Sequence, residues 1–178
     1  MYEHEIKFEV KNLKDLTERL KKEKVVFSGS KHQVDNVWIS KDADGTNLVS
    51  GLPVVRTREE GGKVILTLKI ELAHGTFEEH ETEVGSLEET EHILECLGMR
   101  KLVEIDKDRK FAKFENYNLC LDNVKNLGNF MEIEIVTKTE NQNAKENIIA
   151  LAKKFGLGEE NILKNTYNTL LCRKFNLK

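Results

Sequence analysis

The sequence predicts an α+β fold: a closed antiparallel β-barrel of about eight strands with its helices packed outside. Most segments alternate apolar and polar residues with a period of two, which is typical of strands that bury one face. The connections between these segments are mostly short, and several carry the glycine, asparagine or aspartate expected of hairpin turns. Only a few segments show helical spacing of apolar residues, so helices are a minority that would cover the sheet.

In the first half of the chain, residues 2–10 (YEHEIKFEV) alternate strictly and predict a strand. Asn12 is expected to cap a helix over Leu13–Glu23, in which leucines recur at helical spacing. Further strands are predicted at 25–30, 32–40, 53–60, 63–72 and 74–84, with a turn at 41–47 and a hairpin turn at Gly61 and Gly62.

In the second half, Ser86 followed by Glu89 resembles a capping box and predicts a helix that ends at Gly98. Strands are predicted at 100–115, 117–124 and 129–136, an amphipathic helix at 145–157, and one or two short helices within Glu159–Phe175. The helix at 145–157 is interpreted as outer packing on the barrel, with the face of a homodimer as the alternative.

Composition limits what the protein does. At 178 residues, the chain predicts a single domain over 1–178. With 28 basic and 31 acidic residues it has no basic excess, which disfavours a nucleic-acid partner. No apolar run approaches the roughly 18 residues of a membrane span, and charges from residue 3 disfavour a signal peptide. The cysteines Cys96, Cys120 and Cys172 lack metal-site spacing, which favours reduced thiols in a cytoplasmic protein.

Nearly every predicted strand has one apolar and one charged face. On the first strand, for example, Glu3, Glu5 and Lys7 share a face. A half-exposed sheet would show the same pattern, but here acidic and basic residues segregate by strand, whereas solvated faces usually mix them. The other charged faces carry Arg56 and Arg58, Lys69, Glu81 and Glu83, Lys107 and Arg109, Asp122, and Glu132 and Glu134.

These faces predict a charged bore with a specific kind of ligand. An eight-stranded barrel has room inside for side chains or one small ligand. Charges buried there need partners. A triphosphate with divalent cations supplies both signs, because its oxygens bind Arg and Lys while paired carboxylates bind hard cations such as Mg²⁺ or Mn²⁺. The sequence therefore favours a small-molecule triphosphate as the ligand.

The same residues resemble the CYTH superfamily, which contains the CyaB-type (class IV) adenylyl cyclases and the thiamine and inorganic triphosphatases. Glu3-x-Glu5-x-Lys7 looks like its ExExK signature. The whole series of motifs, taken in order along the chain, is more specific than this signature alone. Within the superfamily, the CyaB branch looks most similar. The set continues with Arg56-x-Arg58, TLK at 67–69, Glu81 and Glu83, Lys107-x-Arg109, LDNVKNLGNFMEIEI at 121–135 and NTYNTLL at 165–171.

The resemblance implies a tunnel of about eight antiparallel strands with a charged bore, in agreement with the pattern. It also implies roles for the residues. The catalytic ligands of Mg²⁺ or Mn²⁺, with two ions expected, would be Glu3, Glu5, Glu132 and Glu134, with Asp122 as a further candidate ligand. The triphosphate would be bound by Lys7, Arg56, Arg58, Lys69, Lys107 and Arg109.

Three functions stay open. The first is a class IV adenylyl cyclase that converts ATP to cyclic AMP and pyrophosphate. The second is a triphosphatase that hydrolyses tripolyphosphate, thiamine triphosphate or a nucleoside triphosphate. The third is a non-catalytic binder of such ligands, which the presence of both acidic pairs disfavours.

Some residues depart from the family pattern or have a plain alternative. Glu79 occupies a place where the family often has a basic residue, which would weaken the phosphate grip. Asp122 has an Asx turn as its alternative. Glu81 and Glu83 have a solvated edge, or structural pairing with the bore arginines, as theirs.

Overall fold

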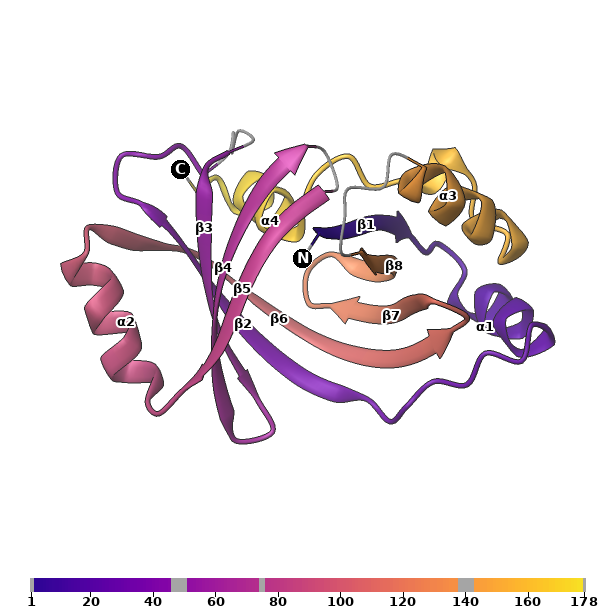
Figure 1. The fold of residues 1–178 in the computed structure, drawn as a ribbon, viewed down its shortest axis with the longest axis horizontal. Helices are drawn as coiled ribbons and strands as arrows, with labels where there is room; N and C mark the ends of the chain where they lie inside the picture. The colour runs from indigo at the N-terminus through magenta and orange to yellow at the C-terminus, as the bar shows by residue number, and fades with distance from the viewer. Residues whose placement is uncertain (1, 46–50, 74–75, 138–142, 178) are drawn as a thin grey trace.

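The computed structural model describes residues 2–45, 51–73, 76–137 and 143–177. Its strands form one closed barrel in the order β1-β5-β4-β3-β2-β6-β7-β8, and every neighbouring pair is antiparallel. Figure 1 shows the barrel with α1, α2 and α3 around it. The predicted fold class is confirmed.

The element bounds are as follows. The strands are β1 (Tyr2–Glu9), β2 (Lys31–Ser40), β3 (Pro53–Glu60), β4 (Lys63–Ala73), β5 (Thr76–Val84), β6 (Met99–Phe114), β7 (Tyr117–Val124) and β8 (Gly128–Thr137). The helices are α1 (Leu13–Lys22), α2 (Leu87–Cys96), α3 (Ala144–Lys154), a short 3₁₀ helix η1 (Glu159–Asn161) and α4 (Tyr167–Phe175).

The barrel closes through its first strand. β1 pairs with β8 from Tyr2 to Glu9, while its register with β5 covers only Tyr2 to His4. β6, with 16 residues, is long enough to pair with β2 in one part and with β7 in another. In Figure 1 it runs beneath both parts of the barrel, from α2 to the region of α1. This strand therefore joins the β2–β5 side to the β7–β8 side.

Local sequence explains where elements begin and end. Gly61 and Gly62 have positive φ of 58° and 80°, the conformation that a tight hairpin turn needs and that glycine adopts without strain. Asn12 caps α1 through its side chain, which accepts a hydrogen bond from the Asp15 amide at 3.1 Å. Ser86 does the same for α2, accepting from the Glu89 amide at 3.2 Å.

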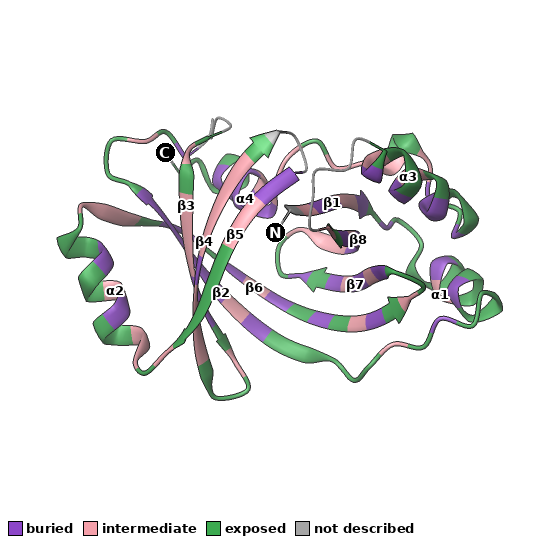
Figure 2. Ribbon diagram, viewed as in Figure 1, coloured by how far each residue is buried: buried purple, intermediate pink, exposed green. Residues whose placement is uncertain are grey.

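One apolar core lies between the outer face of the barrel and the helices that cover it. Helices α1 and α3 bury their apolar side chains against Phe8, Met131 and Ile133. Figure 2 shows these two helices with both buried and exposed residues, as amphipathic packing requires. This packing supports the interpretation of the helix at 145–157 as an outer layer. On the other side, α2 contacts β2 and β3 through the Glu91 carboxylate, which accepts hydrogen bonds from Asn36 (2.6 Å) and Thr57 (2.8 Å).

Helix α4 occupies a different place from the others. Its Tyr167, Leu171 and Cys172 belong to a core cluster with Val37, Ile105 and Phe130. These three barrel residues point into the bore, because the register places them beside Arg56, Asp35 and Asp122 respectively. The C-terminal helix therefore lies against one end of the bore, with apolar side chains packed on those of the barrel.

Several element predictions need correction. The predicted strand at 25–30 is wrong: the segment is irregular, with Val25 buried in the core and Val26 82% exposed. The helix predicted to end at Gly98 ends at Cys96, and Gly98 follows with a positive φ of 83°. Likewise α3 ends at Lys154, although buried Phe155 and Leu157 continue its apolar pattern.

Two predictions fall partly on residues outside those described, namely the turn at 41–47 and the start of the strand at 74–84. The described helices are all too short, or too polar, to cross a membrane. The predicted single domain over 1–178 and the cytoplasmic location stay predictions.

Candidate active site

The charged side chains of the strands meet inside the barrel because register aligns them. On β1 and β8, Glu5 lies opposite Glu134 and Lys7 lies opposite Glu132. On β6 and β7, Arg109 lies opposite Asp122. The strict alternation of each strand then directs all these side chains to the same, inner side. The predicted charged bore is thus present.

A cavity of about 560 Å³ occupies this bore. Five predicted phosphate-binding residues line it: Lys7, Arg56, Lys69, Lys107 and Arg109. Of the predicted metal ligands, Glu5 and Glu132 line it, and Asp35 and Glu71 add further carboxylates. The segment 162–169 before and within α4 completes the wall, so the cavity is shared by the barrel and the C-terminal region.

A group of carboxyl groups, called here the carboxylate cluster, gathers where β1 meets β5 and β8. It consists of Glu3, Glu5, Glu79 and Glu134. The Lys69 ammonium lies among three of them, 3.6 Å from Glu3, 3.3 Å from Glu5 and 3.8 Å from Glu79. Glu134 accepts a hydrogen bond from the Asn118 amide at 3.0 Å. Lys7 also contacts Glu5 at 2.5 Å and Arg56 contacts Glu79 at 3.3 Å, but both cations are shared with acids outside the cluster. The four carboxyl groups therefore outnumber the cations that contact them, which leaves excess negative charge.

The pKa values in the carboxylate cluster reflect this crowding. Burial, the hydrogen bond with Glu79 and the neighbouring charge of Glu5 raise the pKa of Glu3 to about 10, although Lys69 acts against the shift. Burial and the nearby carboxylates of Glu132 and Glu5 also raise the pKa of Glu134. The pKa values of these carboxyl groups are raised because their negative charge lacks compensation. A bound cation would supply that compensation.

The opposite side of the bore, called here the paired wall, consists of Asp35 on β2, Arg58 on β3 and Lys107 on β6. Arg58 donates two hydrogen bonds to Asp35, from Nε at 2.6 Å and from Nη2 at 2.9 Å. Lys107 donates a third at 3.0 Å. Although burial opposes it, the cations Lys107 and Arg58 lower the pKa of Asp35. In the paired wall, therefore, opposite charges satisfy one another.

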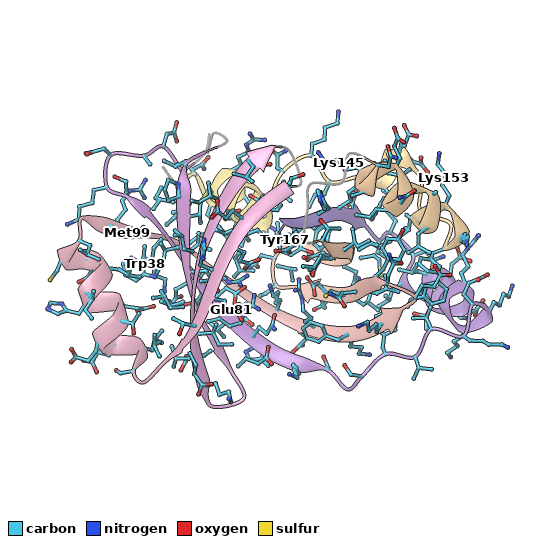
Figure 3. The ribbon with its side chains drawn as sticks, in the orientation of Figure 1. Trp38, Glu81, Met99, Lys145, Lys153 and Tyr167 are labelled. Atoms are coloured by element: carbon cyan, nitrogen blue, oxygen red, sulfur yellow. The ribbon has the colours of Figure 1, made fainter. Side chains whose placement is uncertain are left out.

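Between these two regions lies Arg109, which contacts two carboxylates at once. It donates to Asp122 at 2.6 and 2.5 Å and to Glu132 at 2.6 Å. Despite complete burial, the pKa of Glu132 is well below its usual range because Arg109, Lys7 and Lys107 stabilise its charge. The Tyr167 hydroxyl of α4 donates to the second oxygen of Asp122 at 3.1 Å. Figure 3 shows Tyr167 in the middle of the molecule, between the two sides of the barrel.

The four remaining candidate site residues lie at different places relative to the bore. Asp122 lies inside β7 and not in an Asx turn, and its oxygens contact Arg109 and Tyr167. Glu81 lies near the Arg56 guanidinium at 3.6 Å and accepts from Thr67 at 3.2 Å, with half of its side chain exposed. Glu83 is exposed and pairs with Lys63 at 2.7 Å. Arg58, although buried, does not line the cavity.

Three residues of the bore were not predicted as site residues: Asp35, Glu79 and Tyr167. Asp35 is a single acid on a strand without other charges of its kind nearby, so alternation gave no signal for it. Glu79 was noted only as a departure, yet it contacts Arg56 at 3.3 Å as well as Lys69. Tyr167 could have been found only through its place within NTYNTLL, the C-terminal segment that resembles the family.

The fold and the bore together define a class of protein: a closed antiparallel barrel whose interior holds both cationic and acidic side chains around one cavity. The pattern of the CYTH domain family matches residues 1–167. The chain belongs to the CYTH family, which confirms the resemblance seen in the sequence.

Relatives were found in both sequence and structure. The chain is 29% identical over 172 residues to a protein of Methanocaldococcus jannaschii named "Putative adenylate cyclase", covering 94% of this chain and 97% of that one. A conserved hypothetical protein from Pyrococcus furiosus superimposes with a TM-score of 0.81 at 28% identity, covering 94% and 99%. A more distant structure, from Hippeastrum, has a TM-score of 0.62 at 16% identity and covers 98% of this chain and 95% of that one. It is described as a "putative adenylyl cyclase" with a dominant triphosphatase activity.

Proposed function

We propose that this protein is a metal-dependent enzyme that acts on a triphosphate within the barrel, with ATP cyclisation to cyclic AMP and pyrophosphate as the first candidate reaction. The observation that carries the proposal is the cavity itself. Strands and the C-terminal segment line it, and five of the lining side chains, from β1, β3, β4 and β6, are cationic. A polyanion is the ligand that such a wall stabilises.

One donor in the cavity wall supports an anionic ligand in particular. The Nε of Arg56 is buried and has no hydrogen-bond partner among the described residues, while its Nη2 donates to Thr67 at 3.1 Å and Glu79 at 3.3 Å. A buried N–H without a partner carries a desolvation cost of roughly 1–3 kcal/mol. A phosphate oxygen at Arg56 would remove this cost, and the guanidinium can bind it with fixed geometry.

The carboxylate cluster fits a hard divalent cation by its donor chemistry, because all its donor atoms are oxygens. Among the described residues, no group of three or more His, Cys, Asp or Glu side chains is already arranged around a metal position. The Lys69 ammonium instead lies between Glu3, Glu5 and Glu79. We therefore expect Glu3, Glu5 and Glu134 of the cluster to hold Mg²⁺ or Mn²⁺ once Lys69 moves to the phosphate. Glu132, which lies outside the cluster and pairs with Lys7 and Arg109, is expected to join them when these cations also bind phosphate. Bound there, the metal would supply charge neutralisation and Lewis acidity.

The residues of the chain have the following parts in the reaction. Lys7, Lys69, Lys107 and Arg109, with Arg56, bind the phosphate oxygens and hold the triphosphate along the bore. In cyclisation, the 3′-hydroxyl oxygen of ATP bonds to the α-phosphorus as the bond to the leaving pyrophosphate breaks, and the hydroxyl proton passes to solvent water. The negative charge that develops on the leaving group is stabilised by the same cations, of which Arg56, Lys107 and Arg109 are held in place by ion pairs.

Hydrolysis is the alternative, with tripolyphosphate, thiamine triphosphate or a nucleotide as substrate. The Hippeastrum structure shares only the fold with this chain, but the triphosphatase activity described for it supports hydrolysis as a reaction that this fold can accommodate. The same cations would then hold the substrate while water attacks the γ-phosphorus. The M. jannaschii relative, named "Putative adenylate cyclase" and 29% identical to this chain, supports the cyclase as the first candidate.

Purified protein incubated with ATP or with tripolyphosphate, in the presence of Mg²⁺ or Mn²⁺, tests the proposal. Cyclic AMP with pyrophosphate supports the first candidate, and release of orthophosphate supports the second. A sample containing a chelator serves as the control, since both reactions should then stop. Binding of triphosphates without any turnover would overturn the enzyme assignment and leave a triphosphate-binding protein.

A further inference from the structure

The carboxylate of Asp35 has an unusual position for an acid that faces the anion-binding cavity. It lines the cavity, yet the residue is only 1% exposed. Both of its oxygens are occupied: Oδ1 by Arg58 Nε at 2.6 Å, and Oδ2 by Arg58 Nη2 at 2.9 Å and Lys107 Nζ at 3.0 Å. An acid at this position would repel a triphosphate unless the cations beside it neutralise its charge.

The strand order explains why Asp35 can contact both cations. β2 lies between β3 and β6 in the barrel. Asp35 is directly opposite Arg58 on β3, and Lys107 is opposite Gln33, two residues away on the same face of β2. One carboxylate on the central strand therefore joins side chains from its two neighbours. The bidentate contact with Arg58 fixes the carboxylate plane, and so fixes the direction in which it receives the lysine.

We infer that Asp35 is a positioning residue of this site: clamped by Arg58, it holds the Lys107 ammonium at the cavity wall where a phosphate oxygen of the substrate binds. The inference rests on the proposed function, because the ligand is the same triphosphate. It assigns Arg58 a supporting part and not a direct phosphate contact, in agreement with its absence from the cavity lining.

The charge state of Lys107 supports this assignment. Burial and the neighbouring Arg109 lower the pKa of Lys107 to about 8, while Asp35 opposes the shift. The charged or titratable groups around Lys107 are Asp35 on β2, Arg58 on β3, Arg109 on β6, Asp122 on β7, Glu132 on β8 and Tyr167 on α4. Without the negative charge of Asp35, the pKa of Lys107 would fall further. More of this lysine would then be neutral at pH 7.5, and a neutral amine binds phosphate weakly.

The experiment measures the dissociation constant of tripolyphosphate by calorimetry from pH 6 to 9.5, without divalent metal, so that binding is separated from turnover. In the wild type, affinity should fall as the pH rises through about 8, where Lys107 loses its proton. Asp35→Asn keeps the size of the side chain and removes its charge. We expect roughly tenfold weaker binding at pH 7.5, with the fall in affinity moved to lower pH.

Two controls distinguish positioning from a general structural effect. Asp108→Asn removes an acid from the same strand as Lys107, but one that is exposed and lies 3.3 Å from His32, so it should bind as the wild type does. Lys107→Arg introduces a cation that stays protonated. In this background the fall near pH 8 should vanish, and Asp35→Asn should no longer move the pH profile.

The outcomes are decisive in either direction. A folded Asp35→Asn variant with wild-type affinity and pH profile would overturn the inference, as would a wild type that does not bind tripolyphosphate. If Asp35→Asn does not fold, Asp35→Glu keeps the charge and displaces the carboxylate; wild-type affinity in that variant would also overturn it. Binding that follows the expected pH dependence without any turnover would refute the proposed enzyme and leave the role of Asp35 intact.

Discussion

The carboxylate cluster and the paired wall lie in the same bore, but their charges are balanced in different ways. In the paired wall, Asp35 meets Arg58 and Lys107 at 2.6–3.0 Å, and its pKa is lowered. In the carboxylate cluster, one ammonium, that of Lys69, lies 3.3–3.8 Å from three carboxyl groups, and the pKa of Glu3 rises to about 10. In the paired wall two cations share one carboxylate, whereas in the carboxylate cluster the carboxyl groups outnumber the cations that contact them.

This difference indicates how a bore with charges of both signs can stay folded before it binds anything. The sequence pattern alone favoured a ligand as the partner of the buried charges. The structure shows that many of them instead pair with one another, as Arg109 does with Asp122 and Glu132. Buried ion pairs offset their desolvation cost only with good geometry, so the paired wall acts as a rigid frame. In the carboxylate cluster, by contrast, a bound cation would add most to the stability of the bore.

The largest expected effect is on the carboxylate side. Glu134→Gln keeps the hydrogen-bonding shape but removes a charge from the proposed metal site. We expect metal-dependent turnover to fall at least about 1000-fold, equivalent to about 4 kcal/mol of transition-state stabilisation, with an unchanged circular dichroism spectrum. Glu9→Gln, an exposed position on the same sheet, is the control and should keep full activity. Full activity of Glu134→Gln itself would refute the metal-ligand assignment.

A second effect concerns Arg109, the residue between the two regions. Arg109→Met leaves Asp122 and Glu132 buried without their shared cation. Removing one partner of a buried ion pair costs roughly 3–5 kcal/mol, so the free energy of unfolding in denaturant should fall by about this amount. Lys110→Met, at the next and exposed position, should change it little. A loss below about 1 kcal/mol for Arg109→Met would show that the central ion pairs are not part of the rigid frame.

The smallest effect is expected at the rim, where the bore gives way to solvent. Glu83 is exposed and pairs only with exposed Lys63 among its described salt bridges. Glu83→Gln should therefore leave the denaturation midpoint and turnover unchanged, because exposed ion pairs contribute little. Glu81→Gln, next to Arg56, is the matched comparison and should weaken triphosphate binding only slightly. A strong loss of turnover in Glu83→Gln would extend the site to the rim.

Which charged residues face the bore could largely be predicted from the sequence, because apolar and polar residues alternate along most strands. A period of two is enough to place Glu3, Glu5 and Lys7 on one face of their strand, and Lys107 and Arg109 on one face of theirs. What could not be predicted is which charges meet, because register between strands depends on the whole barrel. Asp35 and Lys107 are 72 positions apart in the chain and come together only through the β2–β6 register.

Segments without a regular period were the other source of error. Residues 25–30 begin with three apolar residues, as a strand can, but do not alternate. The backbone amide of Ser28 donates to the Phe111 carbonyl of β6 at 2.7 Å, and Val25 packs in the core with α1. The part played by α4 in the bore was equally hidden, since an amphipathic helix pattern does not tell which surface the helix covers.

The closure of the barrel through β1 has a consequence for the order in which the protein is made. β1 is synthesised before the other strands of the barrel, whereas one of its neighbours, β8, ends at Thr137. The β1–β8 register that places Glu5 opposite Glu134 can form only after β8 has been made, and the hydrogen bond from Tyr167 to Asp122 only after α4 has been made. Contacts so distant in sequence make folding slow. Closure of the barrel is therefore among the last steps of its folding during synthesis.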